Sequence, residues 1–399
     1  MAFTHGLVGK WVFFCRTGEG IAEHLQPLED AIRTKLIPSL TGQHCGQQTR
    51  DILALPIRLG GLGLVNPTSL AETEYARSKH ITEPLTAMIM GQASEARAAF
   101  AQVMQRRKLV RAEKGREISA AASALKSSLE EDLQRSLDLA AEKGASSWLS
   151  AIPLKRHGFC LHKTAFRDGI CLRYGWQPKS LPTLCACGKD FTVTHAMSCP
   201  CGGYPSIRHN EVRDLTANLL REVCMDVVVE PQLQPLADEV LMGRTCNRKD
   251  EARLDVSARG FWGERFGRAF CDVRVFCPFA PTNASSIEAA YKRHEAEKRR
   301  AYRQRVEDVE HSSFTPLVFS TSGGMGKAAT VFYRRLADLL AEKHNAPYSS
   351  TMAWLRTRLS FALLRSSLLC LRGWRPGNCQ SMEIDRDIIT VAATEVQLV

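Results

Sequence analysis

Residues 268–276 read RAFCDVRVF, and residues 252–258 read ARLDVSA. Each stretch places one aspartate, Asp272 or Asp255, among apolar and β-branched residues, and glycine-rich turn residues lie between the stretches. Short runs of this composition bounded by turn residues predict β-strands. We therefore expect two neighbouring strands, each carrying a single carboxylate in an otherwise apolar setting.

The two aspartates predict a site for a divalent cation. An unpaired buried carboxylate is costly, and two carboxylates on adjacent strands repel each other unless a cation lies between them. Mg²⁺ is bound by one or two carboxylates together with substrate phosphate, and there it activates water and stabilises the leaving oxygen of a phosphodiester. Arg274 lies two residues after Asp272, on the same strand face, where it can hold the scissile phosphate. A plain salt bridge between Asp255 and Arg274 is the alternative.

The sequence around these strands predicts a mixed α/β region over residues 206–345. The predicted elements are a helix over 206–224, a strand over 226–230, the two strands above, a charged helix over 285–308, a strand over 314–320 and a helix over 327–343. This gives the order α, β, β, β, α, β, α. A leucine-rich amphipathic helix over 350–372 follows, and we expect it to dock on the core.

The chain of 399 residues is long enough for two or three domains. We expect a multidomain α and α/β protein with a helical N-terminal half. The expected segments are short helices over 1–65, long helices over 66–148, an irregular cysteine-rich region over 149–205, the mixed α/β domain over 206–345, and a C-terminal helix and tail over 346–399.

A compact group of cysteines and one histidine precedes the mixed region. Its spacing is C-x-C-x7-H-x3-C, and its members are Cys185, Cys187, His195 and Cys199. Zinc takes four such ligands in a tetrahedron, and a full set of protein ligands indicates a structural site. Cys201 or His209 can take the place of Cys199, so the pattern leaves the fourth ligand open.

The charged helix over 285–308 is a candidate surface for nucleic-acid phosphates. Its cations are Lys292, Arg293, Lys298, Arg299, Arg300, Arg303 and Arg305. Lys298 and Tyr302 are four residues apart and share a face. Glutamates alternate with these cations, so the composition favours a plain solvated helix as much as a phosphate-binding surface. Glu211 can reach the cation if its helix packs beside the strands, although an exposed helix charge is the simpler interpretation.

Composition limits the function classes. Lys and Arg number 53 against 42 Asp and Glu, a net charge of +11, which suits a polyanionic partner. The opening residues have no cleavable signal pattern, so we expect 14 reduced cysteines in a nuclear or cytoplasmic protein that is not secreted. No apolar run is long enough to span a membrane. The paired aspartates of a polymerase site are also absent from the sequence.

Taken together, these residues resemble a known family. The Cys/His group, the sequence Arg208-His209-Asn210-Glu211-x-Arg213 and the paired aspartates are similar to the C-terminal region of site-specific non-LTR retrotransposon proteins. The stretch from Phe3 to Gly63 resembles the segment that follows the reverse transcriptase palm in such proteins. The chain is therefore expected to be a fragment, a truncated copy or a host gene product derived from such an element.

The resemblance implies a restriction-like PD-(D/E)xK endonuclease core. Asp255 matches the first metal-binding aspartate of that motif, and Asp272 matches the second acid. Arg274 stands where the motif has lysine, and arginine does not replace lysine as a proton-handling group. Lys298 and Tyr302 match a downstream lysine–tyrosine pair, so Lys298 can substitute for the missing lysine.

The expected function is Mg²⁺-dependent nicking of DNA, which primes reverse transcription in the intact element, with a structural zinc knuckle. Asp255 and Asp272 are expected to hold Mg²⁺, with Glu211 assisting. DNA, and element RNA, are the expected partners. The expected nucleic-acid contacts are Arg208, Lys292, Arg293, Arg299 and Arg303. The alternative is a catalytically decayed, zinc-containing nucleic-acid-binding module.

Overall fold

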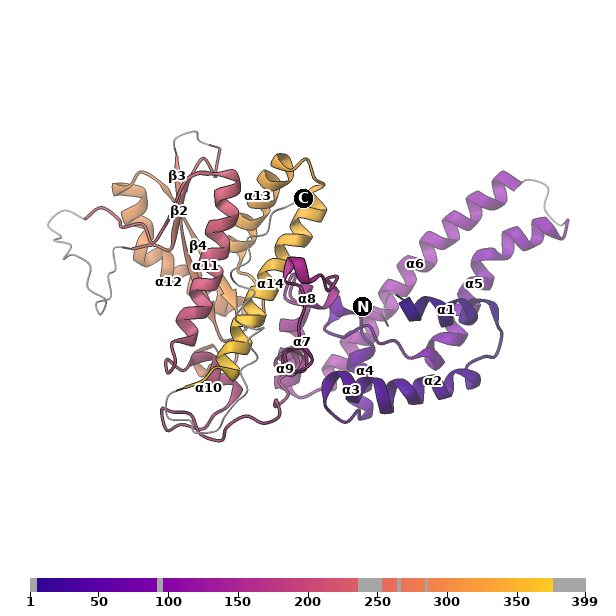
Figure 1. Cartoon of the computed structure of the whole chain (residues 1–399). Coiled ribbons are helices and arrows are strands. Elements are labelled where there is room, and N and C mark those ends of the chain that lie inside the picture. The colour runs from indigo at the N-terminus through magenta and orange to yellow at the C-terminus, as the bar shows by residue number, and fades with distance from the viewer. Residues whose placement is uncertain (1–5, 92–95, 236–252, 264–266, 284–285, 376–399) are drawn as a thin grey trace. The chain divides into compact units, whose positions relative to one another are not determined.

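The computed structural model describes residues 6–91, 96–235, 253–263, 267–283 and 286–375, and it is mostly helical with one small mixed sheet. The chain divides into two compact units (Figure 1). Unit 1 comprises residues 1–141 and 173–176, and unit 2 comprises residues 142–172 and 177–399. Within the described ranges, no helix combines the length and apolar character needed to cross a membrane.

Unit 1 is built from helices. They are α1 (Val8–Thr17), α2 (Gln26–Ala31), α3 (Ile37–Thr41), α4 (Gln47–Ala54), α5 (Pro67–Ile89), α6 (Ala96–Ser127) and α7 (Glu131–Ala141). The long helix α5 begins at Pro67, because the Asn66 side chain accepts hydrogen bonds from the backbone N–H groups of Thr68 and Ser69. Proline at its first position suits a helix N-terminus.

A glycine turn and a buried ion pair hold unit 1 together. A Cβ on Gly61 would lie 1.9 Å from the carbonyl oxygen of Leu55, so only glycine fits this turn. The Arg50 guanidinium, which is 1% exposed, donates to both carboxylate oxygens of Glu29 at 2.6 and 2.7 Å. It also donates to the carbonyl of Leu64 at 2.6 Å, so one side chain connects α4 to α2 and to the segment before α5.

Unit 2 contains the sheet. Its helices are α8 (Ser147–Ser150), most of α9 (Lys163–Tyr174), α10 (Val193–Ser198), α11 (Tyr204–Val223), α12 (Ile287–Gln304), α13 (Lys327–Lys343) and α14 (Tyr348–Arg372). Its strands are β1 (Met225–Val229), β2 (Val256–Arg259), β3 (Arg268–Phe276) and β4 (Ser313–Ser320).

The four strands lie in the order β1-β2-β3-β4. β1 pairs with β2 and β2 pairs with β3 in antiparallel fashion, whereas β3 and β4 are parallel. A parallel pair needs a crossover, and α12 supplies it. β3 is therefore a central strand, and it contributes side chains to both faces of the sheet.

Helices cover both faces (Figure 1). Cys271 and Val273 of β3 point to one face, where they belong to the main core together with residues of α11, α13 and α14. The alternate residues Phe270 and Phe276 point to the other face and pack with residues from α12 and the segment after it. Asp272 lies between these two phenylalanines in the strand and so belongs to the α12 face.

The predicted order of elements from 206 to 343 matches the observed order from α11 to α13. One detail differs, because β2 begins at Val256 and Asp255 comes just before the strand rather than inside it. The Asp255 carbonyl still accepts a hydrogen bond from the backbone N–H of Glu230 at 2.9 Å, which holds it beside the end of β1. The predicted tail after residue 375 lies outside the described residues.

Candidate functional site

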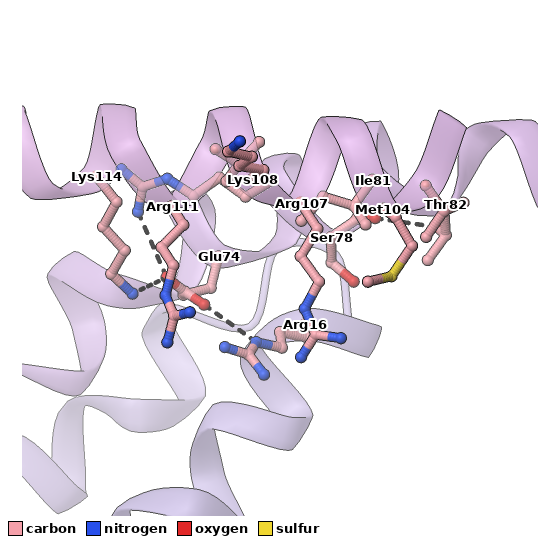
Figure 2. A pocket seen from close by; sticks show the side chains of 13 residues that line it. Arg16, Glu74, Ser78, Ile81, Thr82, Met104, Arg107, Lys108, Arg111 and Lys114 are labelled. Atoms are coloured by element: carbon pink, nitrogen blue, oxygen red, sulfur yellow. Dashed lines mark hydrogen bonds and ion pairs between the residues drawn. The ribbon is translucent and has the colours of Figure 1, made fainter. Parts of the chain in front are cut away.

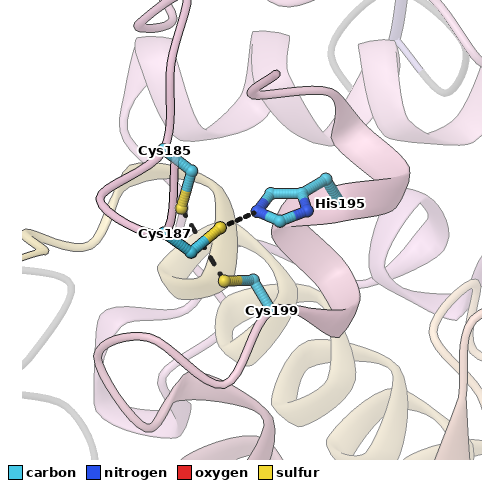
Figure 3. A group of neighbouring side chains, drawn as sticks. All are labelled: Cys185, Cys187, His195 and Cys199. Carbon is cyan, nitrogen blue, oxygen red and sulfur yellow. Dashed lines mark hydrogen bonds between the residues drawn. The ribbon is translucent and has the colours of Figure 1, made fainter. Parts of the chain in front are cut away.

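Three thiols and one imidazole converge in unit 2 (Figure 3). The ligand atoms of Cys185, Cys187, His195 and Cys199 all lie within 4.8 Å of one another. The sulfurs of Cys185 and Cys199 are 3.7 Å apart, and the Cys187 sulfur is 3.3 Å from Nε2 of His195. Zinc–sulfur bonds of about 2.3 Å in a tetrahedron separate two sulfurs by about 3.8 Å, so the observed spacing fits zinc.

Local backbone structure places these ligands. Cys185 and Cys187 lie on a tight turn in which the Gly188 N–H donates to the Cys185 carbonyl at 2.8 Å, and Gly188 has a positive φ of 80°. His195 lies in α10, and the Thr192 side chain caps that helix. Cys199 follows the helix directly, so the four-residue spacing brings it to the same side as His195.

Burial favours the neutral form of three of these groups. Burial, reinforced by the charges of Lys189 and Arg375, lowers the pKa of His195, so its imidazole is neutral and free to coordinate. Burial raises the pKa of Cys185 and of Cys199. A cation among these sulfurs stabilises their thiolate form, and such charge compensation is what a bound metal supplies.

The structure brings Cys199 together with the other three residues, and Cys201 and His209 are not members of the converging group. His209 is instead directed at the acidic pair, where its Nε2 lies 3.0 Å from Oδ2 of Asp255 and 3.1 Å from the carbonyl oxygen of Val273. Within the described ranges, the Cys/His group is also the only set of three or more candidate ligands that meets in this way.

The two predicted aspartates are neighbours across the sheet. Val256 of β2 pairs with Cys271 of β3, so continuing this antiparallel register by one residue sets Asp255 opposite Asp272. Oδ2 of Asp255 accepts a hydrogen bond from the backbone N–H of Val273 at 2.5 Å. The salt bridge between Asp255 and Arg274, which is the alternative to a cation site, is not among the ion pairs of the described residues, and Asp255 pairs with His209 instead.

Asp272 is 5% exposed and has a perturbed pKa. Burial and then the charge of Asp255 raise the pKa of Asp272 to about 6, against the opposing effect of Lys298. The Lys298 ammonium on α12 lies 2.5 Å from Oδ2 of Asp272 and 5.7 Å from the centre of the Tyr302 ring. The predicted Lys298–Tyr302 pair therefore forms and meets the second aspartate.

Two other predicted site residues lie differently. Arg274 is exposed on β3 at a position two residues from Asp272, so its guanidinium is accessible to a ligand. Glu211 does not join the acidic pair. Burial and the charge of Asp214 raise the pKa of Glu211, while Arg365 and Arg358 of α14 lower it, so its charged partners are on α14 rather than on the sheet.

The expected nucleic-acid contacts separate into buried and exposed residues. Arg208 is only 3% exposed and donates to the Met197 carbonyl at 3.0 Å. It therefore joins α11 to α10, and its guanidinium does not face a nucleic acid. On α12, Lys292 and Arg303 form ion pairs with acids one turn away, both at 2.8 Å, as a solvated helix does. Arg293 pairs with Asn283.

Arg299 is the remaining expected contact on α12. Its side chain is exposed, and it forms no ion pair with any residue that the structure describes. Arg299 therefore has the exposed guanidinium, without an ion pair to a described residue, that a contact with a phosphate requires.

Sequence reasoning missed His209 as a partner of the acidic pair. The sequence offers His209 as a substitute for Cys199 in the zinc site. His209 follows buried Arg208 on α11, which packs against β2 and β3, so tertiary packing brings it to the acidic pair. Burial lowers the pKa of His209, but the hydrogen bond and the charge of Asp255 together outweigh burial, so the pKa of His209 is raised overall.

Comparison with models of known protein families found no match, and a search among curated proteins likewise found none.

Proposed function

We propose that the protein is a metal-dependent endonuclease that cuts a phosphodiester bond of DNA at Asp255 and Asp272. One observation carries this proposal: Asp272 is a buried carboxylate whose pKa is raised by burial and by Asp255, and which is met by the Lys298 ammonium. Two repelling carboxylates beside a cationic side chain are typical of sites that bind a divalent cation and a phosphate.

Each residue of the proposed site has a distinct task. Asp255 and Asp272 would hold Mg²⁺, which when bound supplies a Lewis acid and an activated water. The Asp255 carboxylate is oriented by the Val273 N–H and by His209. Lys298 lies where it can stabilise the phosphate as charge develops, and exposed Arg274 can bind the adjacent backbone phosphate.

This arrangement also supports the proposal of a restriction-like core from a retrotransposon protein. The order α11-β1-β2-β3-α12-β4-α13 suits that architecture, and lysine reaches the site from α12 in place of the strand position held by Arg274. The Cys/His group would then act as a structural zinc knuckle beside the nuclease core. In an intact element, the nick would prime reverse transcription.

A plasmid-nicking assay tests the proposed cutting. We expect the full chain to convert supercoiled DNA to the open circle with Mg²⁺, and Asp272→Ala to reduce the rate by at least about a hundredfold, since it removes a metal ligand. Asp338→Ala, which removes an exposed carboxylate on α13, is the matched control and should cut at the wild-type rate. Equal rates in wild type and Asp272→Ala would exclude the site.

A binding module without catalysis is the second candidate. It is favoured by the fact that both carboxylates already have partners, Asp255 with His209 and the Val273 N–H, and Asp272 with Lys298. Such a protein would bind DNA with a strong dependence on salt, and it would leave plasmid intact with Mg²⁺ or Mn²⁺. That combination of results would select the binding module over the nuclease.

A further inference from the structure

A cationic pocket of about 710 Å³ lies in unit 1, between α5 and α6 and beside the end of α1 (Figure 2). Six of its lining residues are basic, and they are Arg16, Arg77, Arg107, Lys108, Arg111 and Lys114. A single carboxylate, Glu74, faces them. The lining therefore has a large excess of positive charge, which attracts an anion.

The Glu74 carboxylate neutralises only part of that positive charge. Its carboxylate is 4% exposed and is bound by Arg16 at 3.1 Å, by Arg77 at 3.4 Å and by Lys114. Although burial raises its pKa, Lys114 and Arg16 lower the pKa of Glu74 overall, so it stays ionised and occupies these cations. One part of the pocket lining is therefore a buried carboxylate held by three cationic side chains.

The remaining cations have no such partner. Arg107, Lys108 and Arg111 are exposed, and they form no ion pair with the residues that the structure describes. Neighbouring Arg106, which does not line the pocket, is by contrast engaged with Glu83. These three cations thus gather on the pocket side, and like charges gathered in this way attract an anion.

The spacing of these cations along α6 fits a polyanion. Arg107 and Arg111 are four residues apart, so they share one face of the helix. They lie about 6 Å apart along the axis at a rise of about 1.5 Å per residue. One strand of a nucleic acid presents a phosphate about every 3.4 Å of duplex axis, so about two phosphates fall within this span.

The rest of the lining favours backbone over base recognition. Its other side chains include Ile81, Val103 and Met104, and none of its lining residues is aromatic. Stacking platforms for unpaired bases are built from aromatic side chains. We propose that this pocket binds the phosphodiester backbone of a nucleic-acid duplex, and that it does so independently of the acidic pair in unit 2.

The test measures duplex binding by fluorescence anisotropy over a range of salt concentrations. It uses the full chain carrying Asp272→Ala, so that the proposed cutting does not interfere. We expect Arg107→Ala with Arg111→Ala to weaken binding and to reduce the slope of log affinity against log salt by about two, since two phosphate contacts are lost. Arg107→Lys with Arg111→Lys should restore most of the affinity, because charge is kept.

The matched control removes two charges elsewhere on the same helix. Arg97 and Arg116 are exposed on α6 and do not line the pocket. We expect Arg97→Ala with Arg116→Ala to keep the wild-type salt slope. If the control and pocket variants lose the same affinity, only the general positive field attracts DNA and the pocket proposal is wrong. Unchanged binding in the pocket variant would overturn it as well.

Competition separates a nucleic-acid backbone from a small phosphate ligand. Unlabelled duplex, tripolyphosphate and inorganic phosphate are compared at equal phosphate concentration. We expect the duplex to displace the labelled probe at far lower concentration than either small anion. If tripolyphosphate competes as well as duplex, the pocket is a site for small polyphosphates and the proposal fails. None of these readouts depends on cleavage, so failure here is distinct from failure of the nicking assay.

Discussion

Asp272 shows how a buried charge makes stability depend on pH. Its pKa of about 6 lies well above the usual value near 4, because burial and then Asp255 disfavour the ionised form. The folded protein therefore binds this proton more tightly than the unfolded chain does. The resulting stabilisation is present below about pH 4 and is lost as the pH rises through about 6.

This predicts the behaviour of Asp272→Asn. Asparagine does not titrate, so the stability of the variant relative to wild type should rise between pH 4 and pH 6–7. The rise should be at most about 3 kcal/mol, because this is the free energy that corresponds to a pKa of about 6 in the folded protein against about 4 in the unfolded chain. Urea unfolding of both proteins across this range measures the difference. A constant difference at every pH would contradict the assigned pKa.

The acidic pair also predicts how the proposed nuclease responds to pH. Asp272 must be ionised to bind Mg²⁺, so nicking should fall as the pH is lowered through about 6 at limiting Mg²⁺. Raising the Mg²⁺ concentration should shift the midpoint to lower pH, because the cation competes with the proton. Nicking rates measured against pH at two Mg²⁺ concentrations test this. A midpoint pH that is the same at both concentrations would argue against Asp272 as a ligand.

At the level of elements, the Cys/His segment is joined to α11 and α14. Arg375 follows α14 and is 1% exposed, and its guanidinium lies 5.0 Å from the Phe191 ring and 4.8 Å from the Tyr204 ring. It also donates to the Cys370 carbonyl at 2.6 Å. Cys370 belongs to the same buried cluster as Cys199, so a metal bound by the Cys/His group would also support the packing at the end of α14.

The metal-ligand set is tested by a pair of cysteine variants. Cys199→Ser should lose bound zinc and stability, because it removes one of the converging ligands. Cys201→Ser, two residues along the chain, should keep one zinc per protein. Elemental analysis of the purified proteins measures the difference. Equal zinc loss in both variants would mean that Cys201 also ligates the metal.

The buried Arg50–Glu29 pair gives a separate prediction for unit 1. Glu29→Gln leaves the Arg50 guanidinium buried without its counter-charge, and this should lower the free energy of unfolding by about 3–5 kcal/mol. Glu23→Gln, at an exposed position just before α2, should change it by less than about 0.5 kcal/mol. Denaturant unfolding compares the two variants, and equal stabilities would show that the pair contributes little.

On the scale of the whole molecule, the secondary-structure elements could be predicted from the sequence better than the tertiary contacts of their side chains. The Cys/His spacing and the alternation in 268–276 are local signals, so they correctly predicted the converging ligands and β3. Asp255 opposite Asp272 followed from neighbouring strands. By contrast, the surroundings of Glu211 and the burial of Arg208 depend on how α11 packs against α14 and α10, and nothing in the local pattern encodes that packing.

The amino-acid sequence by itself determined the order of helices and strands from 206 to 343, three of the four converging Cys and His residues, and the two neighbouring acids. These features arise from residue spacing and from turn and strand preferences within a few residues of each position. Only the tertiary structure decided that His209 meets Asp255, that Lys298 meets Asp272, and that basic residues of α1, α5 and α6 surround Glu74. Such contacts join residues far apart in the chain, and their geometry is set by the packing of whole elements.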